Sequence, residues 1–328
     1  MVKNLRYEDA DHFASEMENA SLGTRLSNLA QILYTAGQST TYLVDTSVSE
    51  NRIEQLIYYL TQGYYNLYTN PYSGKPFQYF NEAYNLAREL DLKSAEKYTL
   101  LSILEVYNFE VSQSNEDKVL FLNRYKDLID DEADRYHYLI NVMQFNLKDI
   151  FLNISINLTF FKDFDALMTS FSDNHRFWPN YYSLKAVFYK TIGRNAEAIQ
   201  LQKKALSLIG TEPFLKYIKF RSNIQLSEIY RLEGDYDRAL EYVNHASNSI
   251  DLSDTTRSKS YIYYYLSRIY EETEDHEKAF NNLLKATDLR DKLNYEQNSL
   301  EIARLNVRYQ TQEKELALLK EREKVRDT

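Results

Sequence analysis

Histidines and clustered carboxylates are the residues of this chain whose types could ligate a metal or move protons. There are five histidines, and none lies three or four positions from another, so no helix turn carries a ready pair of imidazole ligands. They are His12, His137, His175, His245 and His276. We therefore expect no metal site built from histidines that are close in sequence.

One acidic cluster, Asp130-Asp131-Glu132 with Asp134, allows two interpretations. Its carboxylates could bind a metal or work as acid and base, or they could begin a helix, where free N–H groups and the helix dipole favour negative charge. The cluster lacks the glycine and the spacing of a calcium loop. The chain also has no glycine-rich phosphate loop and no nucleophile elbow. The sequence thus predicts no catalytic residue, no metal and no cofactor, and a protein that is not an enzyme.

Three two-helix patterns recur in the second half of the chain at a nearly constant spacing. Their small residues Ala186, Ser227 and Ser267 lie 41 and 40 positions apart. A fixed period of this length is typical of a solenoid, in which each helix pair buries its apolar face only by stacking on its neighbours. The residues expected to pack within and between the repeats are Ala186, Tyr189, Ala198, Ala205, Leu226, Ser227, Tyr230, Ala239, Ala246, Leu266, Ser267, Tyr270, Ala279 and Ala286.

The middle copy shows how such a pair is built. Leu226 and Tyr230 lie one turn apart on one helix face, and the small Ser227 lets a second helix approach closely. A glycine then permits the tight turn, because it adopts the left-handed conformation without steric cost. Ala239 and Ala246 lie seven positions apart on the second helix, so they form one stripe against the neighbouring helix.

This pattern resembles the tetratricopeptide repeat, most clearly over residues 179–290. Pro179 and Pro213 lie near the starts of first helices, where a missing N–H costs little. The period of about 40 residues exceeds the family's usual length of about 34, and Asn223 stands where the family carries a large residue. The resemblance implies an all-α fold, a right-handed superhelical solenoid of helical hairpins that binds proteins or peptides.

The rest of the chain is expected to extend this architecture at both ends. We predict an N-terminal helical cap over residues 1–50, a solenoid of about five to six hairpins over 51–290 and a long C-terminal helix over 291–328. Further helices are expected over 77–87, up to Tyr107, over 117–128 and over 133–147, whereas 150–171 is helical but fits the repeat register poorly.

The C-terminal segment carries apolar residues at spacings of three and four, as in the seam of a coiled coil. The seam residues are Ile302, Leu305, Tyr309, Leu316 and Leu319, with Gln312 interrupting them. Two interpretations stay open, because the tail could cap the last repeat or could form a parallel homodimer that passes a signal onward. Repeats followed by a charged coil resemble the sensory region of bacterial (Bacteroidetes-type) histidine kinases and transcriptional regulators with tetratricopeptide repeats, which would make this chain a sensor part.

Composition limits the classes of partner and location. The net charge of −9 disfavours nucleic acid, whose phosphates need a basic face. The sequence contains no run of about 18 apolar residues that could insert in a membrane. Its first nine residues do not form a signal peptide. Without cysteine there is no disulfide. We expect a cytoplasmic location if the chain is complete and a periplasmic one if it is a processed sensor fragment.

In such a solenoid the first helices line the concave face, which recognises extended or helical peptides. Counted from each small residue, this face is expected to hold Asn180, Ser183, Val187, Lys190, Arg221, Ile224, Glu228, Arg231, Tyr261, Tyr264, Arg268 and Glu271. Its four basic groups favour an acidic or C-terminal peptide as partner, because arginine binds carboxylates through paired hydrogen bonds. Alternatively, these charges are solvated or paired within the protein. The family's carboxylate-clamp variant has asparagines where this chain has Val187 and Glu228.

The sequence therefore predicts a non-enzymatic protein- or peptide-binding module. We expect it to be the sensory or scaffolding part of a bacterial signalling protein, with the tail helix coupled to dimerisation or output. The runner-up is a soluble adaptor or co-chaperone whose tail is a capping helix. A third class, an enzyme, would need pocket chemistry that these residues do not offer.

Overall fold

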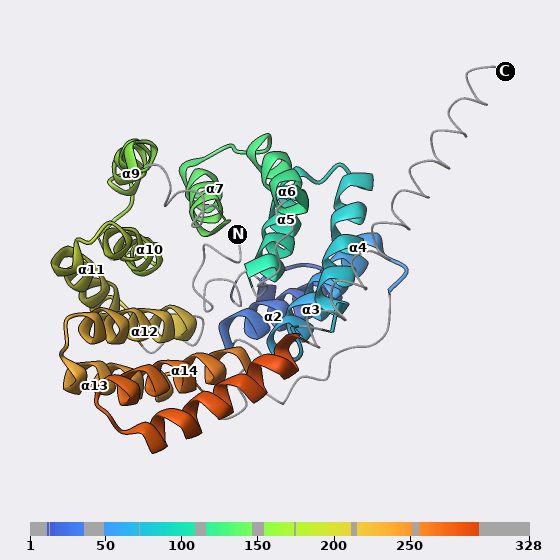
Figure 1. Cartoon of the computed structure of the whole chain (residues 1–328). Coiled ribbons are helices and arrows are strands. Elements are labelled where there is room, and N and C mark those ends of the chain that lie inside the picture. The colour runs from blue at the N-terminus through green and yellow to red at the C-terminus, as the bar shows by residue number, and fades with distance from the viewer. Residues whose placement is uncertain are drawn as a thin grey trace. The chain divides into compact units, whose positions relative to one another are not determined.

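The computed structural model describes residues 12, 14–35, 49–71, 73–108, 116–145, 154–173, 175–210, 215–250 and 256–294. Within these ranges the regular secondary structure is helical, as Figure 1 shows. The predicted all-α fold is therefore confirmed. The chain divides into two compact units, Met1–Gln113 with Asn294–Thr328 and Ser114–Leu293, each with its own packed helices.

The described part of the first unit contains α2 (Ala20–Thr35), α3 (Arg52–Thr69), α4 (Lys75–Glu89) and α5 (Lys93–Asn108), each packed on the next. The Asn51 side chain begins α3 by accepting hydrogen bonds from the N–H groups of Ile53 and Glu54, at 2.9 and 3.3 Å. α3 and α4 approach closely at Gly63, where an added Cβ would lie 2.3 Å from the Phe80 ring. The helices predicted over 77–87 and up to Tyr107 are confirmed as parts of α4 and α5.

The second unit holds the repeats. Its described helices are α6 (Glu116–Lys126), α7 (Glu132–Phe145), α9 (Ile154–Met168), α10 (Trp178–Thr191), α11 (Asn195–Ser207), α12 (Lys216–Leu232), α13 (Tyr236–Ser247), α14 (Thr256–Glu272) and a helix over residues 276–294. α6, α7 and α9 confirm the helices predicted over 117–128, 133–147 and 150–171. The pairs α10–α11 and α12–α13 pack extensively, and α11 and α13 also pack on the helices that follow them. Figure 1 shows these hairpins following one another in chain order.

The small residues of the repeats lie at helix interfaces. Ala186 and Ser227 are fully buried, and Ser267 is 4% exposed. Of the larger residues, Leu226 and Tyr230 are buried, and the others are half-buried, namely Tyr189, Leu266 and Tyr270. The second-helix alanines are buried apart from the half-buried Ala279, the buried ones being Ala198, Ala205, Ala239, Ala246 and Ala286. A larger side chain at a buried position would have to displace the neighbouring helix.

The three hairpins turn in the same way. Gly193, Gly234 and Glu274 have positive φ angles of 78°, 77° and 63°, and they lie 41 and 40 residues apart. In the middle copy the N–H of Asp235 donates to the Tyr230 carbonyl at 2.9 Å, and equivalent bonds close the other two turns at 2.8 and 2.9 Å. This is the left-handed helix ending in which glycine is favoured. The third copy makes it with a glutamate.

We expect Glu274→Gly to stabilise the last hairpin by about 0.5–1 kcal/mol. A left-handed residue with a Cβ is strained by roughly 1–2 kcal/mol, and the gain is reduced because glycine loses more entropy on folding. Thermal unfolding should therefore shift upward. The matched control is Gly234→Ala, which should lower stability by about 1 kcal/mol through backbone strain alone, since no atom lies within 4 Å of the added Cβ. A destabilised Glu274→Gly variant would contradict the assignment of strain.

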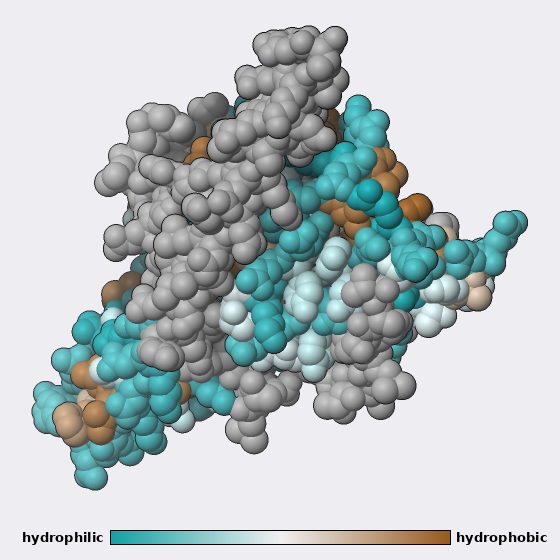
Figure 2. Space-filling model, turned by 90° about the vertical axis from the view of Figure 1, so that its right-hand side faces the viewer, coloured by the Kyte–Doolittle hydropathy of each residue, from teal (hydrophilic) through white to brown (hydrophobic). Residues whose placement is uncertain are grey.

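Surface hydrophobicity is limited on the side of the molecule that Figure 2 shows, where the described residues are mostly hydrophilic and hydrophobic ones form small separate patches. The helix over residues 276–294 exposes Phe280, Leu283 and Leu284, at 64, 46 and 51%. Their spacing places them on one helix face. Among the described helices, none combines the length and apolarity needed to cross a bilayer.

The predicted tail seam lies outside the described residues. It comprises Ile302, Leu305, Tyr309, Leu316 and Leu319. Much of the predicted cap over 1–50 also lies outside them, although α2 falls within it. The alternatives of a capping tail and a dimer seam, the right-handed superhelix and the three-part domain division therefore stay predictions.

Candidate functional site

The first helices of the three hairpins, α10, α12 and α14, lie next to one another in chain order. Polar contacts join neighbouring first helices. The Arg221 Nη2 donates to the Asn180 Oδ1 at 2.7 Å, and Arg231 bonds Glu272, each pair being 41 residues apart. Three of the residues expected on one face, Asn180, Arg221 and Arg231, thus take part in contacts between these helices. We call the surface of α10, α12 and α14 around Asn180, Arg221, Arg231, Tyr261 and Tyr264 the first-helix face.

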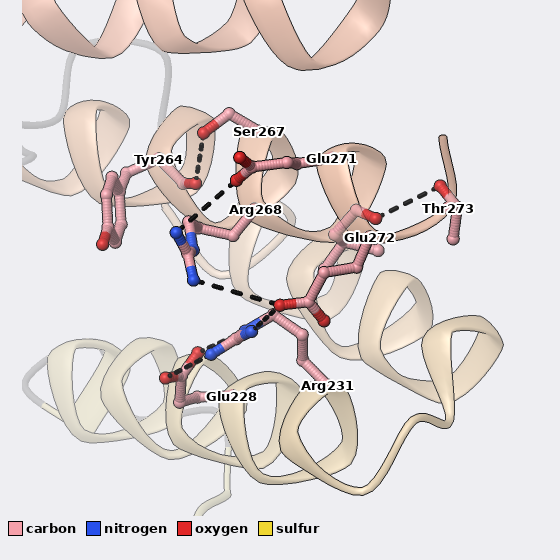
Figure 3. A network of polar contacts seen from close by, with 9 residues as sticks. Glu228, Arg231, Tyr264, Ser267, Arg268, Glu271, Glu272 and Thr273 are labelled. Carbon is pink, nitrogen blue, oxygen red and sulfur yellow. Dashed lines mark hydrogen bonds and ion pairs between the residues drawn. The ribbon is translucent and has the colours of Figure 1, made fainter. Parts of the chain in front are cut away.

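Arg231 is the centre of an ionic network on this face. Its side chain is 8% exposed, and its Nε and Nη2 donate to the two carboxylate oxygens of Glu228 at 3.0 and 3.1 Å. Its Nη1 donates to Glu272 of α14. These hydrogen bonds, with that of Glu228 the largest cause, raise the pKa of Arg231 above its ordinary value. In Figure 3 the Arg231 guanidinium lies between the two carboxylates.

Arg268 joins the same network from α14. It lies 3.5 Å from a Glu271 oxygen and 3.9 Å from the Glu272 oxygen that also binds Arg231, as Figure 3 shows. Two of the four basic groups predicted for peptide binding, Arg231 and Arg268, are therefore neutralised by carboxylates of the protein itself. For these two residues, the alternative of intramolecular pairing is the one that the geometry supports.

Lys190 and Arg221 have different surroundings. Lys190 is half-buried, and burial lowers the pKa of its ammonium, although the nearby Glu228 carboxylate acts in the opposite direction. Arg221 is partly buried, and burial likewise lowers the pKa of its guanidinium. Its hydrogen bonds to described residues go to neutral groups, since Nε donates to the Ser183 Oγ at 3.3 Å and Nη2 to the Asn180 Oδ1 at 2.7 Å. Within the described residues, Arg221 thus carries its charge without a carboxylate.

Ile224 does not lie on the open surface where the repeat spacing was expected to place it. It is 4% exposed and packs in the core with Phe220 and Val243. The expectation fails because Ile224 stands four residues after Phe220, so both point along the core stripe of α12. Ser183 is also fully buried. Tyr261 and Tyr264, in contrast, are 41 and 40% exposed and offer apolar rings at the surface.

The repeats carry a feature that the small-residue pattern did not reveal. A cation covers the tyrosine of each first helix, with Arg194 4.6 Å from the Tyr189 ring centre, Arg238 4.4 Å from Tyr230 and Lys278 5.2 Å from Tyr270. Such contacts are worth about 0.5–1 kcal/mol at exposed sites. In the last two copies the cation follows the tyrosine by eight residues, and this spacing was a usable signal.

The acidic cluster Asp130-Asp131-Glu132 with Asp134 lies at the start of a helix, in agreement with one of the two interpretations. α7 starts at Glu132, and the N–H of Asp134 donates to the Asp131 Oδ1 at 2.7 Å. Of the histidines, His245 and His276 are exposed, and His137 contacts the Tyr136 and Phe177 rings. In the part of the chain that the structure describes, no three side chains of histidine, aspartate or glutamate gather as a metal site. The absence of an enzyme activity, metal and cofactor stays a prediction.

Comparison with known families agrees with the hairpin geometry. Two family models, both described as tetratricopeptide repeat, match residues 179–211 and 219–292. The first match covers most of the hairpin α10–α11, and the second covers most of α12, all of α13 and α14 and most of the helix over 276–294. Among curated proteins, none matches the chain.

These matches support a tetratricopeptide-repeat protein, and with the helices they confirm the predicted all-α solenoid of helical hairpins. Repeats of this class indicate a protein-interaction module. The resemblance to sensory proteins of bacteria is not tested by these matches and stays a prediction.

Proposed function

We propose that this chain is a non-enzymatic module that holds a peptide segment of a partner protein against the first-helix face. The observation that carries the proposal is the alignment of α10, α12 and α14 with exposed tyrosines beside a pre-formed ionic network. The network ties α12 to α14 and so keeps the face ordered before a partner arrives. Tyrosine suits such a face because it contributes a large rigid ring and a polar tip.

The wider role that we propose is sensory or scaffolding, as part of a bacterial signalling protein. Its support is the order of the segments, in which the repeats precede the apolar seam from Ile302 to Leu319. The tail would couple partner binding to dimerisation or output. Sedimentation of the full chain and of a truncation ending at residue 298 tests this role. A tail-dependent dimer supports it, whereas two monomers would favour the soluble adaptor with a capping tail.

Peptide binding can be tested with a synthetic array of random octapeptides, half ending in a free carboxylate and half in an amide. The wild-type chain should retain a defined subset of sequences. The double variant Tyr261→Ala/Tyr264→Ala should bind the retained peptides at least about tenfold more weakly, because buried tyrosines dominate such interfaces. Phe280→Ala, which removes an exposed ring from a second helix, is the matched control. No retained peptide, or equal losses in both variants, would contradict the proposal.

A further inference from the structure

His175 lies in the turn that joins α9 to α10, and its imidazole is half-buried. The Phe177 N–H donates to the His175 Nδ1 at 3.3 Å. Because a backbone N–H can only donate, Nδ1 must offer its lone pair, so the ring is neutral and carries its proton on Nε2. A protonated imidazole has an N–H at both nitrogens and could not accept this hydrogen bond.

The start of α10 depends on His175 more than on a side chain of the helix itself. Phe177, which directly precedes the helix, makes no capping hydrogen bond through its side chain, and Pro179 has no N–H. The His175 carbonyl accepts the Trp178 N–H at 3.1 Å, while its ring accepts that of Phe177. The ring therefore does what an asparagine often does in a turn, where the side chain accepts from the N–H two residues later.

The surrounding groups hold the imidazole in this orientation. Its centre lies 4.3 Å from the centre of the Phe177 ring and 4.9 Å from that of Phe171. The turn is also fixed through the Ser172 carbonyl, which accepts the His175 N–H at 2.9 Å and the Trp178 indole N–H at 2.8 Å. The neutral ring thus faces the Phe177 N–H as part of a packed turn.

Several charged or titratable groups belong to the elements around this turn. They are Asp173 and Arg176 in the turn, Tyr136 and His137 on α7, Asp165 on α9 with its partner Lys185 on α10, and Arg221 on α12. Burial, and after it the positive charge of Arg176, lower the pKa of His175. Both causes disfavour a charged imidazole in the folded chain, in the same direction as the hydrogen bond from Phe177.

Phe177 connects this turn to α7. Its ring stacks on that of Tyr136 with centres 3.8 Å apart, and its carbonyl accepts the Tyr136 hydroxyl at 3.2 Å. Three residues further along α10, the Asn180 side chain binds Arg221 of α12. The residues that follow His175 therefore link α7 to the first hairpin of the repeats.

We infer that His175 is a pH-sensitive switch at the start of α10, whose neutral ring holds the Phe177 N–H and whose protonation releases it. Because the folded chain disfavours the charged ring, the unfolded chain takes up the proton more readily as the pH falls below about 6.5. The stabilisation is therefore present at neutral pH and is lost in mild acid, which loosens the link between α7 and the repeats. The inference goes beyond the proposed function, since it concerns the folded chain alone and needs no partner.

Hydrogen exchange of the Phe177 amide, followed by NMR in the wild type and in His175→Asn at the same pH, tests the switch. Asparagine can accept the same bond but does not titrate. We expect similar exchange in the two proteins at about pH 7.5 and exchange about 3- to 10-fold faster in the wild type at about pH 5, as the loss of one hydrogen bond predicts. His175→Ala has no acceptor and should exchange faster than His175→Asn at both pH values.

His137→Gln is the matched control, because it removes the other histidine that contacts the Phe177 ring. It should keep the pH dependence of the wild type. A ratio of wild-type to His175→Asn exchange that stays the same at the two pH values would contradict the switch. An NMR titration of the folded wild type that places the pKa of His175 at or above the ordinary value of about 6.5 would do so as well, since the folded chain would then not resist protonation.

Discussion

Replacing Arg231 by glutamine is expected to lower the free energy of unfolding by about 2–4 kcal/mol. The guanidinium is 8% exposed and is bound by Glu228 and Glu272, whose side chains are only 19 and 29% exposed. Glutamine would leave two half-buried carboxylates without their shared cation, and an uncompensated charge is the costly outcome of breaking such a pair. Urea unfolding measures the total loss of stability. Because the chain has two compact units, hydrogen exchange of the α12 and α14 amides should be measured as well, to locate the loss in the second unit.

Arg268→Gln is the matched control for this prediction. Its side chain is 42% exposed and pairs at 3.5 and 3.9 Å, so its loss should change stability by at most about 0.5 kcal/mol. A second variant, Arg231→Met with Glu228→Gln and Glu272→Gln, should recover most of the lost stability, because the two carboxylates that lost their shared cation are then neutral. An effect of Arg231→Gln as small as that of Arg268→Gln would show that the network contributes no more than a surface pair.

Phe164→Ala is expected to lower the free energy of unfolding by about 3–5 kcal/mol. The ring is fully buried on α9, with its centre 4.9 Å from the Tyr181 ring of α10 and 5.9 Å from the Tyr136 ring of α7. Alanine would leave a cavity among rings that cannot close together. Urea unfolding measures the total loss, and hydrogen exchange should show it first in α7, α9 and α10.

The control for Phe164 is Phe280→Ala, the same chemical change on a ring that is 64% exposed. It should alter stability by at most about 0.5 kcal/mol, since it removes little buried area. Similar losses in the two variants would mean that the cluster of α7, α9 and α10 is not packed as described. A loss under about 1 kcal/mol at Phe164 would lead to the same conclusion.

The repeat pattern was enough to predict the helical hairpins of the second unit. Helix packing at a small residue depends on its volume, which is visible in the sequence, so Ala186, Ser227 and Ser267 could be recognised as equivalent. The turn after them was only partly predictable. Gly193 and Gly234 predict a residue in the left-handed conformation. Glu274 does not predict it, but adopts the same conformation because the hydrogen bonds of the turn impose it.

Counting positions from the small residue of each first helix predicted the residues of the candidate site only in part. Tyr261 and Tyr264 are exposed, but Ile224 is not, because Phe220 one turn earlier directs that stripe of α12 into the core. The cluster around Phe164 could not be predicted from the repeat pattern either, since the segment over 150–171 does not share the register of the repeats. Its burial follows from the rings of two other helices that meet on α9.

The sequence by itself determined that the second half of the chain forms paired helices with a period of 40 to 41 residues, because apolar spacing and residue size act locally along a helix. Only the tertiary structure decided which cations are neutralised. Arg231 meets Glu272 and Arg221 meets Asn180 across 41 residues, while Glu228 is supplied by the same helix as Arg231. Charge compensation depends on the distance through space between stacked helices. Arg231 therefore lies between carboxylates, whereas Arg221 bonds neutral groups.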